Sequence, residues 1–328
     1  MHPTPARRGF TLIELLVSLA IFGLVAAYLF ETFNSTHRAY VVVDSVSEVQ
    51  QNIQALADRI HRDIRAAGYS VAEHASICVW DATNGPDTLF VSNPDAIRTA
   101  DQLAAVDPLL AIADLGAPVA AVGPGWTSSS PVSLSQSFVD VAADGADFAQ
   151  NQGVILVDRN DASGRVACGI ITNANPGTTL QVDFGGTVLT ASGSPDVVAV
   201  PANVYRIMQP AGQPAQLQRN GLTFAQDVED LQIALFFDAN GDRVVDPGEF
   251  VGDGVGADYD PSVMNGQDLR DVRFNLVLVT REPDPRESYN EGRGQVTENR
   301  AAGTLSAQDG LRRRVHSETV RIRNVGNR

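Results

Sequence analysis

The chain has 328 residues, a formal net charge of −15, 44% hydrophobic residues and 19% charged residues. This length is sufficient to bury a sizeable core in one large domain or two small ones, and the composition excludes a chain that is disordered throughout. The acidic balance argues against binding to the phosphate backbone of nucleic acid as the main function, because like charges repel. We therefore expect a folded protein whose main partner is not nucleic acid.

The N-terminal segment predicts a membrane span. Residues 10–30 read FTLIELLVSLAIFGLVAAYLF, an apolar run with one charge, Glu14, and no proline. About 20 apolar residues cross the hydrocarbon core, and the preceding Arg7 and Arg8 favour a cytoplasmic N-terminus with the body on the far side. A cleaved secretory signal has a shorter apolar run with its small residues after it, whereas here Gly9 comes before the run.

The helical pattern continues past this apolar run. There is no glycine or proline from Leu24 to Ala67, and Gly68 is typical of the residue that follows a helix. The spacing predicts one helix over about 11–67, roughly 85 Å long at 1.5 Å per residue. Its first half is apolar on all sides. Its second half carries a single apolar stripe at spacings of three and four, which predicts packing on a folded domain: Val42, Val46, Val49, Ile53, Leu56, Ile60, Ile64 and Ala67.

Beyond Gly68, short runs of Val, Ile, Thr and Phe alternate with Gly, Pro, Asn and Asp, which is typical of strands and loops. Apolar residues at every second position, as in LQIALFF (231–237) and VRFNLVLV (272–279), indicate strands with one buried face. Consecutive strands favour an antiparallel sheet packed on the long helix, an α+β fold. The stretch 101–137 is expected to be irregular. The predicted strands are Thr88–Ser92, Val154–Asp158, Ala167–Thr172, Thr179–Phe184, Asn203–Met208, Leu231–Phe237, Val272–Thr280 and Ser317–Asn324.

The N-terminal sequence RRGFTLIELLVSLAIFGLV resembles the class III signal of type IV pilins and type II secretion pseudopilins. The resemblance implies a pilin-like fold, cleavage after Gly9 by a prepilin peptidase and methylation of the new N-terminal residue, Phe10. It also implies that Glu14 supplies a counter-charge to the new amine of a neighbouring subunit in the filament. A pair between Glu14 and the amine of its own Phe10 is the alternative, because the two residues are four apart on one helix.

Three further segments resemble the PilW-type minor pilins: LADRIHRDIRAAGYS, DVEDLQIALFFDANGDRVVD and LRRRVHSETVRIRNVGNR. The resemblance implies a minor pilin that works with other minor pilins, the major pilin and the inner-membrane pilus assembly platform. The J-type pseudopilin of type II secretion shares much of this layout, and a pilus-tip adhesin or DNA-uptake subunit is a further alternative. The expected segments are a leader (1–9), a membrane and filament-core helix (10–30), an amphipathic helix (31–68) and an extracytoplasmic head (69–328).

The segment DANGDRVVDPGE has the ligand spacing of a calcium loop. Oxygen-bearing side chains occupy positions 1, 3, 5, 9 and 12, and the carbonyl of Val244 lies at position 7. Arg243 replaces the glycine usual at position 6, and the flanking segments are strand-like. The alternative is an acidic β-turn. We expect a structural calcium ion, with these ligands: Asp238, Asn240, Asp242, Val244, Asp246 and Glu249.

The chain has two cysteines, Cys78 and Cys168, and no CxxC or zinc-ligand spacing. In an extracytoplasmic head a disulfide between them is expected, and two buried thiols are the alternative. The five histidines form no HExxH motif, and there is no GxSxG. We therefore do not expect an enzyme. The basic run Arg312–Arg314 is interpreted as a charge patch at a strand edge or between subunits.

Overall fold

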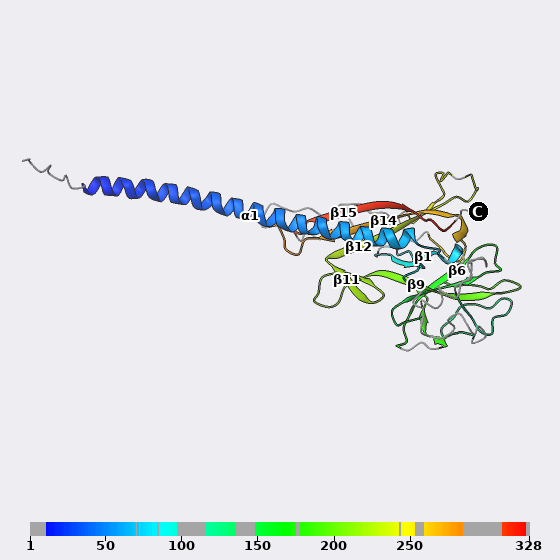
Figure 1. Ribbon diagram of the computed structural model, residues 1–328. Helices are drawn as coiled ribbons and strands as arrows, with labels where there is room; N and C mark the ends of the chain where they lie inside the picture. Colours follow the sequence, from blue (N-terminus) through cyan, green and yellow to red (C-terminus); the bar gives the residue numbers. More distant parts are fainter. Residues whose placement is uncertain are drawn as a thin grey trace, which may run out of the picture.

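The fold is a long helix attached to a β-rich head (Figure 1). In the computed structural model, helix α1 (Leu12–Arg65) extends far beyond the head, and its second half lies along it. The expected α+β, pilin-like layout is therefore confirmed. The structure describes residues 11–69, 71, 73–83, 85–96, 116–135, 148–174, 178–242, 244–252, 259–284 and 310–325.

The described part of the head forms three antiparallel sheets. In the largest, the order is β1-β2-β9-β5-β6-β8; β3 and β10 also pair with β9, and β11 pairs with β10. The second has the order β13-β12-β14-β15, and the third joins β4 to β7. The strands are β1 (Ile77–Trp80), β2 (Thr88–Val91), β3 (Ala117–Pro118), β4 (Val132–Ser133), β5 (Gly153–Asp158), β6 (Val166–Ile171), β7 (Thr179–Leu180), β8 (Val182–Asp183), β9 (Val197–Met208), β10 (Gln216–Arg219), β11 (Leu222–Gln226), β12 (Val228–Phe237), β13 (Phe250–Val251), β14 (Leu269–Val279) and β15 (Arg313–Arg321). The described residues also form the short 3₁₀ turns η1 (Glu73–Ala75) and η3 (Gly266–Asp268).

The second half of α1 packs on the four-stranded sheet. The alternating residues predicted for this sheet all belong to one buried core, with Ile233 opposite Phe274 and Leu231 opposite Leu276. The predicted helical stripe meets them from Val49 onward, whereas Val42 and Val46 are only half-buried. Because burial of apolar area supplies most of the stabilisation, the firmly held part of α1 begins near Val49.

The helix ends against the C-terminal segment of the chain. Its C-cap is Ala66, and Gly68 follows with φ of +77°, the left-handed conformation that glycine adopts at least cost. A Cβ at Gly68 would lie 3.0 Å from Val325. The Asn324 amide donates to the carbonyls of Ala66 (3.3 Å) and Ala67 (3.0 Å), which have no partner within the helix. The segment that leads from α1 into the head is therefore hydrogen-bonded to the segment that follows β15.

The loop between β1 and β2 joins the two larger sheets through a buried carboxyl group. The N–H of Asp87 donates to the carbonyl of Leu231 on β12 (2.8 Å), and the N–H of Ile233 donates to the Asp87 carboxyl group (2.8 Å). Asp87 has no exposed surface. Burial, together with the neighbouring carboxylates of Asp81 and Asp230, raises the pKa of Asp87 to about 8. The folded protein therefore holds a proton at Asp87 that the unfolded chain releases.

We predict that the free energy of unfolding falls as the pH rises from about 5 to 8. The stabilising contribution of the Asp87 proton is complete below the unfolded pKa near 3.8 and is lost as the pH rises through about 8. The slope is at most about 1.4 kcal/mol per pH unit. The variant Asp87→Asn is expected to flatten the pH profile between pH 5 and 8, measured by urea unfolding of the full chain in detergent.

Asp158 provides a matched control for this pH profile, since it too is completely buried. Burial alone would raise the pKa of Asp158, but hydrogen bonds from the backbone of Asp196, Ser192 and Asn160 outweigh it and lower the pKa. Its contribution is lost only in acid, as the pH falls through the lowered pKa. Asp158→Asn should therefore reduce stability equally at pH 5 and pH 8. A slope that persists in Asp87→Asn would contradict the assignment to Asp87.

Candidate functional site

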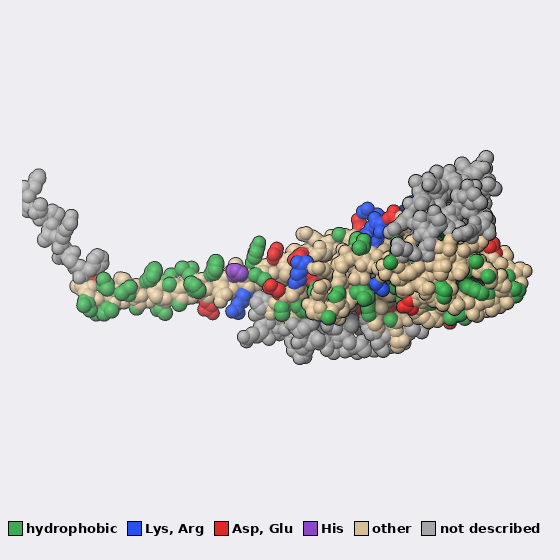
Figure 2. Space-filling model, turned by 90° about the horizontal axis from the view of Figure 1, so that it is seen from below, with side chains coloured by type: hydrophobic (Ala, Val, Ile, Leu, Met, Phe, Trp, Pro, Cys, Tyr) green, Lys and Arg blue, Asp and Glu red, His purple; other side chains and the backbone are tan. Residues whose placement is uncertain are grey.

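The first half of α1 presents an apolar surface that the described chain does not cover. Its most apolar 18-residue window has a mean hydropathy of 2.4 and none of it is buried. Leu12, Phe22 and Phe30 each expose more than 70% of their surface. On the face seen in Figure 2, hydrophobic side chains follow the helix from its start toward the head. A helix of this length and composition can cross a bilayer, and exposing it to water would be unfavourable.

Glu14 closes a capping box at the start of this helix. Its carboxylate accepts hydrogen bonds from the N–H and the hydroxyl of Thr11, both at 2.9 Å, and the Thr11 hydroxyl accepts from the N–H of Glu14 (3.3 Å). The pattern Thr-x-x-Glu satisfies free donors at a helix N-terminus, where the helix dipole also favours a carboxylate. The Glu14 carboxylate is therefore hydrogen-bonded to Thr11. Only one residue, Phe10, separates Thr11 from the predicted cleavage point in the sequence. Gly9 and Phe10 themselves lie outside the described residues.

A buried polar network fastens the second half of α1 to the largest sheet. The Asp63 carboxylate accepts from the Tyr205 hydroxyl on β9 (2.5 Å) and from Arg219 on β10 (2.9 Å), and Arg59 lies 3.4 Å from it. Asp63 exposes only 4% of its surface and Tyr205 none. Burial, reinforced by the Asp63 charge, raises the pKa of Tyr205, so the hydroxyl stays protonated as a donor. Arg59 and Arg219 also pair with Asp95.

Sequence reasoning did not identify this network. Asp63 does not belong to the predicted apolar stripe, and a charged residue outside such a stripe is expected to face solvent. Tyr205 and Arg219 lie 142 and 156 residues further along the chain. No local pattern connects such distant positions.

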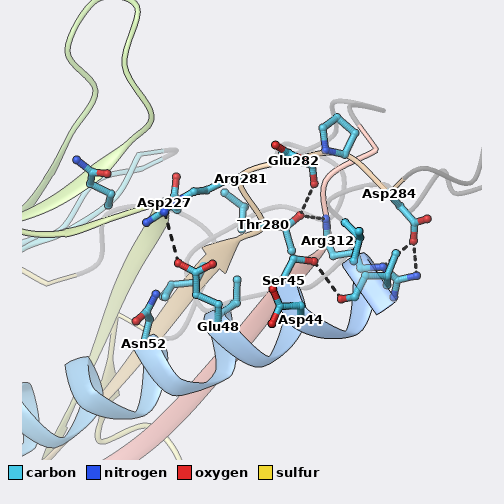
Figure 3. Close-up of a pocket in the computed structure, with 17 residues that line it drawn as sticks. Asp44, Ser45, Glu48, Asn52, Asp227, Thr280, Arg281, Glu282, Asp284 and Arg312 are labelled. Atoms are coloured by element: carbon cyan, nitrogen blue, oxygen red, sulfur yellow. Dashed lines mark hydrogen bonds and ion pairs between the residues drawn. The ribbon is translucent and has the colours of Figure 1, made fainter. Parts of the chain in front are cut away.

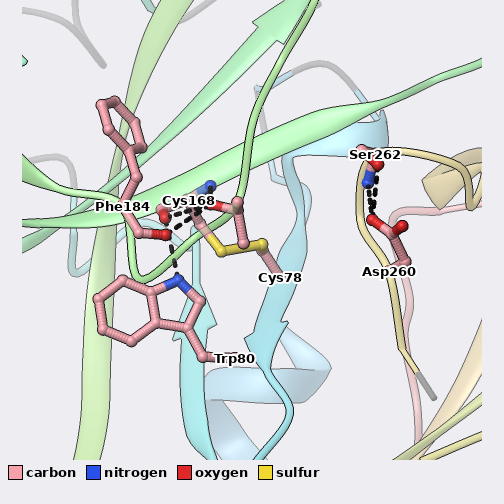
Figure 4. The surroundings of a disulfide bond; sticks show 7 residues. Cys78, Trp80, Cys168, Phe184, Asp260 and Ser262 are labelled. Atoms are coloured by element: carbon pink, nitrogen blue, oxygen red, sulfur yellow. Dashed lines mark hydrogen bonds between the residues drawn. A yellow bond between two sulfur atoms is a disulfide. The ribbon is translucent and has the colours of Figure 1, made fainter. Parts of the chain in front are cut away.

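Cys78 and Cys168 form a disulfide that joins β1 to β6 (Figure 4). The two strands are four places apart in the order of the largest sheet, so the bond requires that sheet to curl until they meet. Both cysteines are fully buried, and the Trp80 indole N–H donates to the carbonyl of Cys168 (3.0 Å). The interior of the curl is filled by a core that includes Phe90, Ile155 and Val200. The disulfide thus closes a packed half-barrel.

The predicted calcium loop follows β12, and its side chains are engaged with the protein itself. Asp238 is buried and pairs with Arg270 at 3.3 Å. Asn240 and Asp242 accept from backbone N–H groups two residues further on, and the Glu249 carboxylate accepts from the N–H of Ala239 and of Asp246.

In the described part of the chain, no three Asp, Glu, His or Cys side chains converge as metal ligands require. Asn240, Asp242 and Asp246 are exposed, and the buried Asp238 is paired with Arg270. Calcium therefore remains a prediction from the sequence, with the ligand set Asp238, Asn240, Asp242, Val244, Asp246 and Glu249.

The basic run Arg312–Arg314 lies at the start of the edge strand β15. Arg312 donates twice to Asp284, at 2.8 and 2.5 Å, and Arg313 pairs with Glu229 at 2.7 Å. Two of its three charges are therefore compensated within the chain. The location at a strand edge agrees with the sequence interpretation.

Comparison with known families connects the helix start to a processing signal. The model of the prokaryotic N-terminal methylation motif matches residues 4–30. Together with the long apolar helix and the curled antiparallel head, this motif indicates a type IV pilin-like or pseudopilin-like protein, anchored to the membrane by α1. No curated protein and no solved structure matches the chain.

Proposed function

We propose that the chain is a minor pilin of a type IV pilus, which primes or takes part in filament assembly. The observation that carries this proposal is the exposed apolar half of α1 directly behind a methylation motif. A prepilin peptidase would cleave after Gly9 and methylate Phe10. The helix would hold the protein in the bacterial inner membrane, N-terminus in the cytoplasm and head in the periplasm, until the assembly platform adds it to the pilus.

The role proposed is assembly and not catalysis. Lipid covers the apolar half of α1 first, and the helices of the major pilin and other minor pilins replace it in the filament. The exchange is physically reasonable because hydrocarbon chains and apolar side chains solvate such a surface equally well. The head remains outside the helix bundle and is held to α1 by the apolar core and the Asp63 network.

Deletion of the gene distinguishes this proposal from the second candidate. The methylation motif and the helix-plus-head layout fit a J-type type II secretion pseudopilin equally well, so the fold does not separate the two. We expect the deletion strain to lose surface pili, seen by electron microscopy, while protein export continues. Loss of export with normal piliation would favour the pseudopilin. An adhesin or DNA-uptake role would instead leave pilus number unchanged and reduce binding.

We predict that Glu14→Ala blocks incorporation and leaves cleavage at Gly9 intact. In the filament core an uncompensated charge costs about 2.5–3.5 kcal/mol, so the unpaired amine of a neighbouring subunit should reduce incorporation about a hundredfold. The measurement is immunoblotting of sheared filaments and of membranes. Glu31→Ala, a carboxylate on the same exposed helix, is the control. Normal incorporation of Glu14→Ala would exclude the intersubunit pair.

We propose further that the loop Asp238–Glu249 binds a structural calcium ion. The support is its oxygen spacing and the turn in which Asn240 and Asp242 accept hydrogen bonds from backbone N–H groups two residues further on. Calorimetric titration of the full chain in detergent should show heat at micromolar to millimolar calcium, the range of such loops. Glu249→Gln should weaken calcium binding, whereas Asp260→Asn, outside the loop, should not. Absence of heat at millimolar calcium would identify the loop as an acidic turn.

A further inference from the structure

A cavity lies where α1 leaves the head (Figure 3). Its volume is about 210 Å³, and it is bounded by one face of α1 between residues 41 and 52, the end of β14 and the segment 280–284. Val42, Val49 and Leu278 contribute an apolar lining. Sites for small molecules typically measure about 300–1,000 Å³, so this cavity has room for one long side chain and not for a cofactor.

The lining of the cavity is acidic. Two arginines, Arg281 and Arg312, face five carboxylates, which leaves three negative charges in excess (five minus two). Like charges that line one cavity repel one another. Figure 3 places the carboxylates on both walls, some on α1 and some on the opposite segments. They are Asp44, Glu48, Asp227, Glu282 and Asp284.

Both arginines are already engaged. Arg312 donates two hydrogen bonds to Asp284, whose side chain has no exposed surface. Arg281 donates to Asp227 at 2.8 Å and lies 3.4 Å from Glu48. The side chains of Asp44 and Glu282, by contrast, are exposed at the rim and have no ion-pair partner in the described part of the chain. The rim therefore offers two carboxylates above an apolar floor.

We propose that this cavity receives a lysine or arginine side chain from a neighbouring pilin-like subunit of a different kind. A basic side chain matches the site in both parts, because its alkyl stem can lie along the apolar lining while its charged end turns back to the rim, where Asp44 and Glu282 are exposed. The location fits as well. Tyr40 and Val43, beside the cavity on α1, are 70% and 63% exposed, so a helix packed along the apolar half of α1 would pass its mouth.

This inference rests on the proposed function, since it requires a neighbouring subunit. The test uses the full chain, tagged on the head and produced together with the other subunits that carry a methylation motif. The double variant Asp44→Asn, Glu282→Gln removes both rim charges and keeps the side-chain shapes. We expect recovery of the partner subunit to fall about fivefold at physiological salt, as for two partly exposed ion pairs. The thermal midpoint of the chain alone should not change, because these exposed carboxylates have no ion-pair partner among the described residues.

The matched control is Asp183→Asn, which removes an exposed carboxylate from β8 on the other sheet and should leave recovery unchanged. Equal recovery of the partner by the wild-type chain and the double variant would overturn the cavity assignment alone. Recovery of only a second, differently tagged copy of this chain would overturn the assignment to another subunit. If the wild-type chain recovers no pilin-like subunit, the proposed function itself fails.

Discussion

Replacing Asp63 by alanine is expected to lower the free energy of unfolding by about 3–5 kcal/mol, the usual cost of removing one partner from a buried charged network. Arg219 and the Tyr205 hydroxyl would lose their common acceptor, and Arg59 would lose its nearest carboxylate on α1. Water cannot replace it, because Asp63 is 4% exposed and Tyr205 is fully buried. Urea unfolding of the full chain in detergent, followed by tryptophan fluorescence, measures the effect.

Asp58→Ala is the matched control for this change, since it makes the same substitution on the same helix five residues earlier. Asp58 is 74% exposed in its side chain, and among the described residues its one ion pair is with Arg62, one turn away. Exposed pairs of this kind contribute about 0.3–0.5 kcal/mol. Tyr205→Phe should fall between the two, at about 1.5–3 kcal/mol, because it removes one hydrogen bond to a charged group. Equal effects of Asp63→Ala and Asp58→Ala would show that the network does not hold the helix.

The Asp63 network joins α1 and the head at a second place, beside the apolar core. The apolar core packs α1 against both larger sheets, and Asp63 adds a buried polar attachment to β9 and β10 of the largest sheet. Loss of this polar attachment alone would leave the apolar packing of α1 in place and loosen the hold of α1 on the largest sheet. Under the function proposed above, a head held less firmly to α1 would pack less well against neighbouring subunits even in a chain that folds.

Those parts of the fold that depend on local periodicity could be predicted from the sequence. The helix was expected over about 11–67 and spans Leu12–Arg65, and the alternating residues of β12 and β14 meet as expected. The strand predicted at Ser317–Asn324 instead begins at Arg313 and ends at Arg321, because its residues pair with β14 and Asn324 turns to cap the helix. The first and last residues of a strand depend on such distant partners, so the bounds of a strand are harder to predict than its presence.

Other features of the structure were not predicted from the sequence, and the physical reason is different for each. β9 runs from Val197, although only its second half was expected, because Pro201 breaks the sequence signal of a central strand. The sheet supplies enough other pairing to override it. The β10–β11 hairpin had a usable signal, the Asn220–Gly221 turn with both residues at positive φ. The Thr11–Glu14 capping box was equally readable, whereas the cavity beside α1 depends on segments more than 200 residues apart.

Removing the Cys78–Cys168 disulfide should have the other large effect on stability. The bond links residues 90 positions apart, and a cross-link over a loop of this length restricts the unfolded chain by about 4–5 kcal/mol on the chain-entropy model. The double variant Cys78→Ala, Cys168→Ala should therefore unfold at much lower urea concentration than the oxidised wild type. Part of the loss should be enthalpic, because two small cavities would remain in the buried core around Phe90 and Ile155.

A reductant separates the contribution of the cross-link to stability from that of side-chain packing around the cysteines. Unfolding the wild-type chain in the presence of dithiothreitol removes the cross-link and keeps both sulfur atoms in the core, so it should show most of the loss seen in the double variant. The variant itself should be indifferent to dithiothreitol. Because the Trp80 indole lies against Cys168, its fluorescence reports whether the half-barrel opens locally before the four-stranded sheet unfolds. If the reduced wild type is as stable as the oxidised form, the curl is held by its apolar core, and the disulfide would not be what closes it.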